Sequence, residues 1–223
     1  MGYRHEWKHQ INTEDLLVLR ERLATFMRRD SNAQNGLYEV RSLYFDNLYD
    51  KALREKINGV NRREKFRLRY YNGSTALIRL EKKSRLGELS KKEQTVLSAK
   101  EARSLLEGEM EWMLSSGRGL LQELYSKMRY EGLRPKSIVE YTREPYVFAP
   151  GNVRVTLDTN IRSSLDCHAF LDRDCPTVPV GGAFGLLEVK WDAYLPDIVR
   201  DAVQIPGRQT VSFSKYAASR IYG

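Results

Sequence analysis

The sequence has little of several residue types that mark particular classes of protein. Only two of its 223 residues are cysteines, Cys167 and Cys175, and only three are histidines. Two cysteines do not supply the four ligands of a structural zinc site, so we interpret both as reduced thiols. The histidines, His5, His9 and His168, show no arrangement with a serine or cysteine that indicates nucleophilic catalysis. Zinc-dependent folding and triad hydrolysis are therefore not the chemistry that this sequence predicts.

Long apolar runs are also missing. No stretch approaches the ~20 apolar residues of a membrane-spanning helix, and the first residues, MGYRHEWKHQ, lack the apolar region of a signal peptide. We therefore expect a cytoplasmic protein without a membrane span. Because the sequence has no Pro- or Ser-rich linker, internal repeat or low-complexity run, we expect residues 1–223 to form a single domain.

Charge of one sign is in excess. There are 37 Lys and Arg residues against 29 Asp and Glu, a formal net charge of +8, and charged residues make up 30% of the chain beside 41% hydrophobic ones. The chain is therefore globular but unusually charged. A basic excess favours an anionic partner, which could be a nucleic acid, an acidic membrane surface or a phosphate-rich ligand. Net charge alone does not choose among the three.

Three segments have the hydrophobic spacing of helices. Residues 13–29 form an amphipathic pattern that Thr13 can cap. Residues 99–130 predict one or two further helices, broken near Gly117 and Gly119, and the segment from Ser212 to Ile221 predicts a short terminal helix.

Eight shorter runs alternate between polar and apolar residues, as strands do. They are residues 3–9, 38–45, 63–70, 75–83, 91–97, 136–143, 152–159 and 184–191. The dipeptide Asn72-Gly73 predicts a tight hairpin between the third and fourth runs, which makes these two strands antiparallel. Eight antiparallel strands can close into a barrel, which removes exposed sheet edges.

The strand patterns place charged residues together on one face. In the third run that face carries Arg63, Lys65, Arg67 and Arg69, while Phe66, Leu68 and Tyr70 lie on the other. The same alternation recurs in Arg79, Glu81 and Lys83, in Arg154, Thr156 and Asp158, in Glu188 and Lys190, and in Arg4, Glu6 and Lys8. A half-exposed sheet alternates in the same way, but these faces are rich in arginine and recur on at least five strands.

Neighbouring cations on one strand face repel each other unless anions neutralise them. Such a face is therefore expected where a polyanion binds, with a few carboxylates available for a divalent metal. The faces could point outward as a nucleic-acid surface, or inward, with helices covering the apolar exterior. Nucleic-acid surfaces usually add exposed aromatic residues for stacking, whereas here the aromatic residues fall mostly on the apolar face. We therefore predict an α+β fold in which an eight-stranded antiparallel barrel forms a tunnel with a charged lumen, flanked by helices.

Seven motifs, in order along nearly the whole chain, resemble a known family. They are VRSLYFDN (40–47), KFRLRYY (65–71), RLEKK (79–83), VEYTREPYV (139–147), VRVTLDT (153–159), LLEVK (186–190) and SFSKY (212–216). Together they resemble the VTC domain, the polyphosphate polymerase domain of the vacuolar transporter chaperone complex, which has bacterial relatives. That domain belongs to the triphosphate tunnel metalloenzymes, also called the CYTH-like superfamily, whose fold is an eight-stranded barrel with a charged lumen.

The resemblance and the charged strand faces imply roles for particular residues. The residues expected to act on the transferred phosphate are Lys8, Arg67, Arg69, Lys83, Arg143, Arg154 and Lys190. Further phosphate contacts are expected from Lys56, Lys65, Arg79, Ser214 and Lys215. The Ser214-Lys215 pair opens the last predicted helix, whose N-terminus would favour an anion. Glu188 matches the metal-binding glutamate of the family, and Glu81 and Glu6 are expected to assist it in holding Mn or Mg.

The activity that the resemblance implies is metal-dependent transfer of the terminal phosphoryl group of a nucleoside triphosphate, such as ATP, onto a polyphosphate chain. With water as acceptor, the same tunnel would act as a tripolyphosphatase or nucleoside triphosphatase. A non-catalytic polyphosphate-binding module is a third alternative, and a nucleic-acid binder is the least favoured. The expected partners are a nucleoside triphosphate and polyphosphate, with association with a membrane partner left open. The chain departs from the eukaryotic transporter subunits in having no second phosphate-sensing domain and no membrane segment, and residues 165–182 form a loop that does not align.

Overall fold

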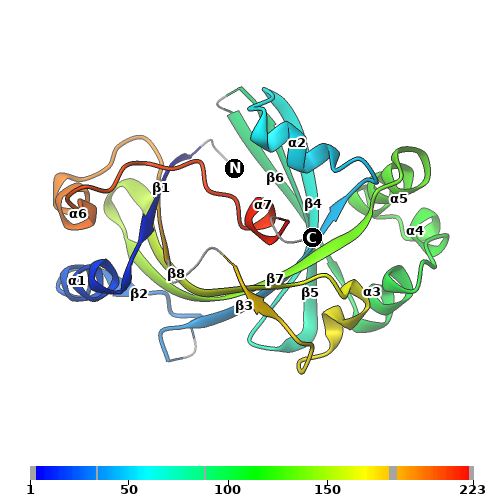
Figure 1. Ribbon diagram of the computed structural model, residues 1–223, viewed down its shortest axis with the longest axis horizontal. Helices are drawn as coiled ribbons and strands as arrows, with labels where there is room; N and C mark the ends of the chain where they lie inside the picture. The colour runs from blue at the N-terminus through cyan, green and yellow to red at the C-terminus, as the bar shows by residue number, and fades with distance from the viewer. Residues whose placement is uncertain (1–3, 34, 88, 181–184, 221–223) are drawn as a thin grey trace. The chain divides into compact units, whose positions relative to one another are not determined.

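The computed structural model describes residues 4–33, 35–87, 89–180 and 185–220. In this part of the chain, ten strands form a mostly antiparallel sheet accompanied by seven α-helices (Figure 1). The strands are β1 (His5–Ile11), β2 (Arg28–Arg29), β3 (Tyr38–Asp46), β4 (Arg62–Tyr71), β5 (Ser74–Leu86), β6 (Leu89–Leu97), β7 (Arg134–Phe148), β8 (Val153–Ser164), β9 (Val178–Pro179) and β10 (Gly185–Trp191). The α-helices are α1 (Thr13–Ala24), α2 (Lys51–Ile57), α3 (Ala99–Leu106), α4 (Trp112–Ser115), α5 (Gly119–Glu131), α6 (Asp197–Val203) and α7 (Lys215–Ser219).

The strands pair in the order β1-β10-β8-β7-β3-β4-β5-β6, with β2 beside β7 and β9 beside β8. Each of the eight predicted runs overlaps one long strand of this order, and the predicted Asn72-Gly73 hairpin joins β4 to β5. The predicted strand starts at residues 3 and 184 lie outside the described residues. Within the described residues the pairing order is a linear path, so closure into a barrel stays a prediction.

The first helix begins where the sequence predicts but ends earlier and has a different cap. It ends at Ala24 rather than near residue 29, and Arg28 and Arg29 instead form the short strand β2. The N-cap is Asn12, not Thr13. Asn12 Oδ1 accepts a hydrogen bond from the Asp15 backbone (2.8 Å), while Asp15 Oδ2 accepts one from the Asn12 backbone (2.9 Å). This reciprocal pair satisfies two donors that the first helical turn would otherwise leave unpaired.

The helical segment after β6 divides more finely than predicted. Residues 99–130 contain α3, α4 and α5, because the chain turns at Gly108 as well as at Gly117, both in the left-handed region (φ 85° and 67°). The terminal helix spans only Lys215–Ser219, and the predicted end at residue 221 lies outside the described residues. Helices α2 and α6 were not predicted, since seven residues are too few for a clear helical period.

The segment expected as a loop at residues 165–182 is partly ordered. It contains a 3₁₀ turn, Cys167–Leu171, and the short strand β9, while residues 181 and 182 lie outside the described residues. Phe170 in this turn is fully buried, and its carbonyl accepts a hydrogen bond from the Tyr70 hydroxyl (2.8 Å). Apolar burial therefore holds a segment whose composition alone suggests a loop. The two cysteines form no disulfide, as expected.

The chain divides into two compact units, and it passes between them within β3, β7, β8 and β9 and again between Ser214 and Lys215. Unit 1 comprises Met1–Glu39, Tyr141–Ile161 and Pro179–Ser214. Unit 2 comprises Val40–Glu140, Arg162–Val178 and Lys215–Gly223. The expectation of a single domain stays a prediction, and the units are described separately.

In unit 1, helices α1 and α6 contribute to an apolar core with β1, β8 and β10. Leu19 and Leu23 of α1 and Val199 of α6 are buried in the same cluster as strand residues such as Val155 and Leu187.

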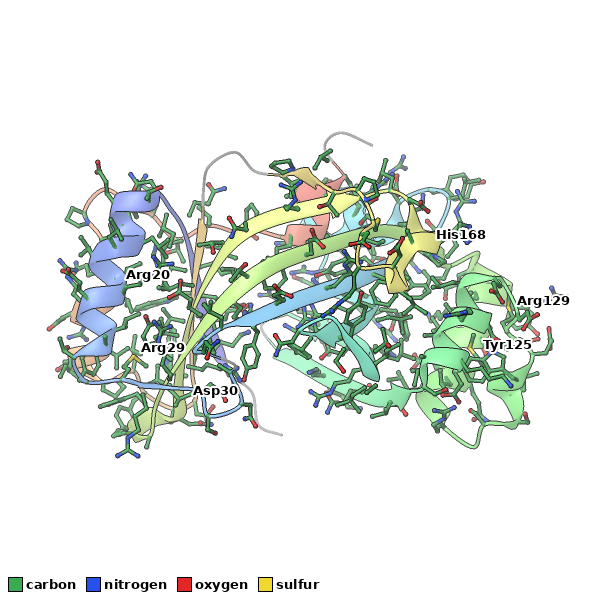
Figure 2. All side chains as sticks on the ribbon, turned by 90° about the horizontal axis from the view of Figure 1, so that it is seen from below. Arg20, Arg29, Asp30, Tyr125, Arg129 and His168 are labelled. Atoms are coloured by element: carbon green, nitrogen blue, oxygen red, sulfur yellow. The ribbon has the colours of Figure 1, made fainter. Side chains whose placement is uncertain are left out.

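A buried carboxylate also connects α1 and β2 to β7. Arg20 shares its Nε–H between the two oxygens of the Glu144 carboxylate (2.9 and 3.0 Å). Arg29 donates two further hydrogen bonds to Glu144 Oε2 (3.2 and 3.3 Å) and lies over the ring of Tyr146. Figure 2 labels Arg20 on α1, with Arg29 and Asp30 at the nearby segment. Glu144 therefore links β7 to α1 and β2 and stabilises their packing.

In unit 2, helices α3, α4 and α5 cover the apolar side of β4 and β5. Phe66, Leu68 and Leu80 from the strands share a buried cluster with Leu105 of α3 and Leu121 of α5. In both units, therefore, helices cover the apolar side of the strands, and the charged residues are left on the opposite side. This confirms the predicted assignment of the two strand faces.

Candidate functional site

A charged face runs across β1, β10 and β8 in unit 1. Directly opposed residues of an antiparallel pair point to the same side of the sheet. Lys8 opposes Glu188, and Glu188 opposes Thr156. We call this surface the unit 1 charged face; its residues are Glu6, Lys8, Arg143, Arg154, Thr156, Asp158, Glu188 and Lys190.

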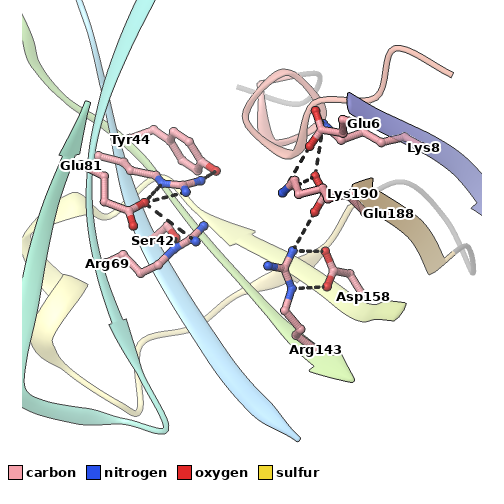
Figure 3. A network of polar contacts seen from close by, with 11 residues as sticks. Glu6, Lys8, Ser42, Tyr44, Arg69, Glu81, Arg143, Asp158, Glu188 and Lys190 are labelled. Carbon is pink, nitrogen blue, oxygen red and sulfur yellow. Dashed lines mark hydrogen bonds and ion pairs between the residues drawn. The ribbon is translucent and has the colours of Figure 1, made fainter. Parts of the chain in front are cut away.

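Two carboxylates on this face share two lysines (Figure 3). Lys190 Nζ lies 3.0 Å from Glu188 Oε1 and 3.3 Å from Glu6 Oε1. Lys8 Nζ lies 3.2 Å from Glu6 Oε2 and 3.6 Å from Glu188 Oε1. The structure thus brings together four residues that the sequence predicts for the site, with positive charge held between two carboxylates.

The other carboxylate oxygen of Glu188, Oε2, lies near Arg143, which is also paired with Asp158. Arg143 forms a two-pronged ion pair with Asp158, Nε to Oδ1 at 2.6 Å and Nη2 to Oδ2 at 2.7 Å, and its Nη2 also lies 3.3 Å from Glu188 Oε2 (Figure 3). Asp158 is 0% exposed and Glu188 is 6% exposed. Sequence reasoning placed Asp158 on the charged face but gave it no role. The contact with Arg143, across two strands, is visible only in the structure.

These contacts control which groups are charged. Burial raises the pKa of Glu188, but Lys190, Glu6 and Lys8 outweigh it, so this pKa lies well below the ordinary range. Burial lowers the pKa of Lys8, but Glu188 and Glu6 leave it above its usual value. Burial also opposes the charge on Arg143, and Asp158 holds the pKa of Arg143 well above normal. Glu188, Lys8 and Arg143 therefore all stay charged at neutral pH.

The donors on this face fit a divalent cation. Mg²⁺ and similar hard cations bind through one or two carboxylates and complete their shell with water and phosphate oxygens. Glu6 and Glu188 supply two such carboxylates. The hydroxyl of Thr156, opposite Glu188, is buried without a hydrogen-bond partner in the described structure, which is a feature of sites that receive a ligand. Within the described residues, no group of three His, Cys, Asp or Glu side chains could hold a metal ion by itself.

Arg154 lies on the same face, but its carboxylate partner comes from outside that face. Its Nη2 donates to Asp30 Oδ2 (2.9 Å), on the segment that follows β2. Burial raises the pKa of Asp30, but hydrogen bonds from Asn32 and the charge of Arg154 lower it overall. Arg154 is therefore positioned by a carboxylate that the sequence did not single out.

Unit 2 has its own charged face, formed by rows of residues opposed across β4, β5 and β6. One row contains Lys65, Lys83 and Lys92, with no acidic residue among them. We define the unit 2 charged face by Ser42, Tyr44, Arg63, Lys65, Arg67, Arg69, Arg79, Glu81, Lys83, Arg85 and Lys92. It includes five predicted basic site residues, and Lys92 is an addition that sequence reasoning missed, although its alternation with Gln94 and Val96 in β6 could have revealed it.

Glu81 is surrounded by cations. Arg67 approaches its Oε2 through Nε (2.7 Å) and Nη2 (2.6 Å), and Arg69 Nη1 lies 3.9 Å from the same oxygen (Figure 3). Lys92 Nζ lies 2.5 Å from Oε1, an ion pair without the alignment of a hydrogen bond. Glu81 is 1% exposed; burial raises its pKa, but Arg67, Arg69 and Lys92 lower it far below normal. Glu81 belongs to unit 2, whereas Glu6 and Glu188 belong to unit 1, and the metal contact expected of Glu81 stays a prediction.

Two hydroxyls of β3 complete this face. Arg69 Nε donates to Ser42 Oγ (2.9 Å), and Arg67 Nη1 donates to the Tyr44 hydroxyl (3.2 Å). Burial raises the pKa of Tyr44, but Arg67, Lys65 and Arg69 lower it to about 7. Both residues lie in the VRSLYFDN motif, and neither was predicted for the site.

Three remaining predicted residues lie at element ends. Lys56 is in α2, Lys215 is the first residue of α7, and Ser214 immediately precedes it. The helix begins at Lys215, as the resemblance implies, and three residues after the start at Ser212 that the spacing predicted, while the anion contact stays a prediction.

Comparison with known proteins places the chain in a family. The model of the VTC domain matches residues 3–221, so the chain belongs to the VTC domain family, as the sequence motifs indicated. No curated protein matches it.

Solved structures resemble this chain at low sequence identity. The PH1012 protein from Pyrococcus horikoshii OT3 is similar over 96% of this chain and 98% of its own, with 12% identity and a TM-score of 0.52. A protein from Bacillus halodurans, provisionally named an adenylate cyclase, matches over 91% of this chain and 87% of its own, with 14% identity and a TM-score of 0.49. In the part of the chain that the structure describes, no helix is long and apolar enough to cross a membrane.

Proposed function

We propose that this chain is a metal-dependent phosphotransferase that moves the terminal phosphoryl group of a nucleoside triphosphate onto a polyphosphate chain. The observation that carries the proposal is the row of three lysines, Lys65, Lys83 and Lys92, directly opposed on adjacent strands. Like charges in this arrangement destabilise a sheet unless anions neutralise them, and Lys92 is the member of the row that contacts Glu81. A ligand with closely spaced negative charges would relieve the repulsion among the lysines, and this relief would favour its binding. A linear chain of phosphates carries its charges at such close spacing.

Phosphoryl transfer needs little covalent chemistry from a protein, because positioning and charge neutralisation provide most of the catalysis. Arg67, Arg69, Arg143 and Arg154 are suited to hold phosphate oxygens, since each presents a planar fork of donors fixed by a carboxylate or hydroxyl. A tunnel closed by the eight long strands, as the family resemblance implies, is part of this proposal.

Glu188 and Glu6 are the residues that we propose to hold Mg²⁺ or Mn²⁺. Such an ion, when bound, would neutralise phosphate charge and polarise the transferred group. Lys8 and Lys190 contact both carboxylates and would hold them in place beside the ion. Arg143, fixed by Asp158, would keep Glu188 in place from its other oxygen.

Incubation of the purified protein with ATP and Mn²⁺, with products resolved by chain length, tests the function. Long chains are expected. Orthophosphate alone would instead establish a triphosphatase, and tight polyphosphate binding without turnover would establish a binding module. The tunnel fold accommodates a water acceptor as well, so product analysis is the decisive measurement.

Glu188→Gln tests the metal assignment. Turnover should fall by about 10–100-fold or more, and the metal concentration for half-maximal rate should rise, because a charged ligand is lost. Glu93→Gln is the matched control, since Glu93 lies on the opposite face of β6 from Lys92 and forms an ion pair with Lys91. Undiminished metal-dependent turnover in the Glu188 variant would refute the assignment.

A further inference from the structure

Two arginines oppose each other at the end of the unit 2 charged face. Arg63 of β4 and Arg85 of β5 are register partners beside the turn between β5 and β6. Like charges directly opposed across two strands repel. Burial and the charge of Arg85 lower the pKa of Arg63, and Glu55 acts weakly in the other direction.

Neither arginine has a carboxylate partner within the described structure. Arg63 Nη1 donates to the Val60 carbonyl (2.6 Å), and Arg85 Nε donates to the Gly87 carbonyl (2.7 Å). A guanidinium carries five N–H donors, so most donors of both side chains remain available. On the opposite face of the same strands the situation differs, because Lys82 is neutralised by Glu64 and Glu123.

The pair continues the rows of the charged face. Arg63 lies two residues before Lys65 and four before Arg67, so all three side chains point to the same side of β4. From Arg63 to Arg69 is six residues, or ~20 Å of strand at about 3.3–3.4 Å per residue. The three phosphates of a nucleotide are too few to contact rows spread over this length. A longer phosphate chain could reach the outermost row.

We infer that Arg63 and Arg85 form a distal phosphate subsite, which binds a segment of linear polyphosphate beyond the phosphates held at Arg67 and Arg69. The inference rests on the proposed function, because it assumes that phosphates occupy the inner rows. The exposed apolar neighbours of the pair, Ile57, Val60 and Leu86, are aliphatic. They offer no ring on which a nucleobase could stack, so a bare phosphate chain fits better than RNA.

The test compares the binding of two ligands to the wild type and to one double variant. Affinities for tripolyphosphate and for long-chain polyphosphate are measured for the wild type and for Arg63→Gln/Arg85→Gln. The double variant should weaken long-chain binding about tenfold or more, since hydrogen bonds to charged groups are lost. Its affinity for tripolyphosphate should stay within about twofold, because screening limits the influence of distant exposed charges.

A matched control removes the same number of charges from the opposite face. Arg62 and Lys91 lie on the same three-stranded region but point away from the rows, as their register partners Leu86 and Ser84 show. Arg62→Gln/Lys91→Gln should leave both affinities within about twofold, because exposed charges off the path of the ligand act only through a screened field. Thermal unfolding checks that both variants are folded.

Several outcomes would overturn the inference. It fails if the control variant weakens the binding of long-chain polyphosphate as much as Arg63→Gln/Arg85→Gln does. It also fails if Arg63→Gln/Arg85→Gln weakens the binding of tripolyphosphate as much as that of long-chain polyphosphate. A loss confined to the binding of single-stranded RNA or of anionic vesicles would overturn it as well. If the wild type binds neither phosphate ligand, the proposed function itself fails. If it binds tripolyphosphate but gains nothing from a longer chain, the proposed function stands and the distal subsite does not.

Discussion

Asp158 holds Arg143 through two nearly parallel ion-pair contacts of 2.6 and 2.7 Å, and it is itself completely buried. The same arginine reaches Glu188 at 3.3 Å. Two acids of the unit 1 charged face thus contact this arginine, Asp158 through two atoms and Glu188 through one. Asp158 is in this view a positioning residue, because it acts on any bound phosphate only through Arg143.

Asp158→Asn should therefore lower both stability and activity. Losing the Asp158 charge leaves Arg143 with the longer contact to Glu188, and breaking a buried ion pair in this way costs about 3 kcal/mol in the free energy of unfolding. Denaturant unfolding measures this cost. Asp197→Asn is the control, since the ion pair of Asp197 with Arg200 is exposed to solvent, and this substitution should cost less than about 0.5 kcal/mol. Equal stability of the two variants would contradict the buried-pair interpretation.

Glu144→Ala should reduce stability without altering phosphate binding. Its carboxylate joins Arg20 and Arg29, but both arginines are partly exposed, so we expect a loss of about 2–3 kcal/mol rather than the full cost of a buried pair. Denaturant unfolding and tripolyphosphate binding measure the two effects. A large loss of phosphate affinity in folded protein would show that this side of β7 belongs to the site.

Tyr44 should ionise near pH 7 in the folded protein, since Arg67, Lys65 and Arg69 lower its pKa against the effect of burial. The sign follows from the lowered pKa. Between about pH 7 and the ordinary tyrosine pKa of ~10, the unfolded chain binds the extra proton, so the stability contribution of Tyr44 rises with pH and is lost as the pH falls through about 7.

The near-ultraviolet absorbance of tyrosinate, measured as the difference between the wild type and Tyr44→Phe, follows this titration. Phosphate bound at Arg67 should shift it to higher pH, because the added negative charge disfavours the phenolate. A difference spectrum that titrates only near pH 10 would contradict the prediction.

Glu81→Gln separates the counter-ion role from the predicted metal-ligand role. As a counter-ion, Glu81 competes with phosphate for Arg67, Arg69 and Lys92, so its removal should strengthen metal-free binding of tripolyphosphate while lowering stability. Calorimetric titration in the presence of a chelator measures the affinity. Unchanged metal-free affinity combined with weaker metal binding would favour the metal-ligand role.

Much of the fold could be predicted because the relevant signals are local. Period-two alternation located all eight long strands, and the Asn-Gly dipeptide located the β4–β5 turn. Element ends were less predictable, because they depend on competition between nearby groups. Asn12 and Thr13 are both residue types that cap helices. Asn12 is the cap in the structure because Asp15 lies three residues after it and completes the reciprocal pair of hydrogen bonds. The short helices α2 and α6 carry too few residues for a periodic pattern.

The sequence by itself determined which residues lie on charged strand faces, because a strand sends alternate side chains to opposite sides whatever its neighbours are. It also determined the family, through motifs spread along the chain. Only the tertiary structure decided which charges meet: Asp158 with Arg143, Asp30 with Arg154, and Glu81 with Arg67 and Lys92. Those pairs join residues on different strands or on a segment far away in sequence, and register and loop path, rather than alternation, set their distances.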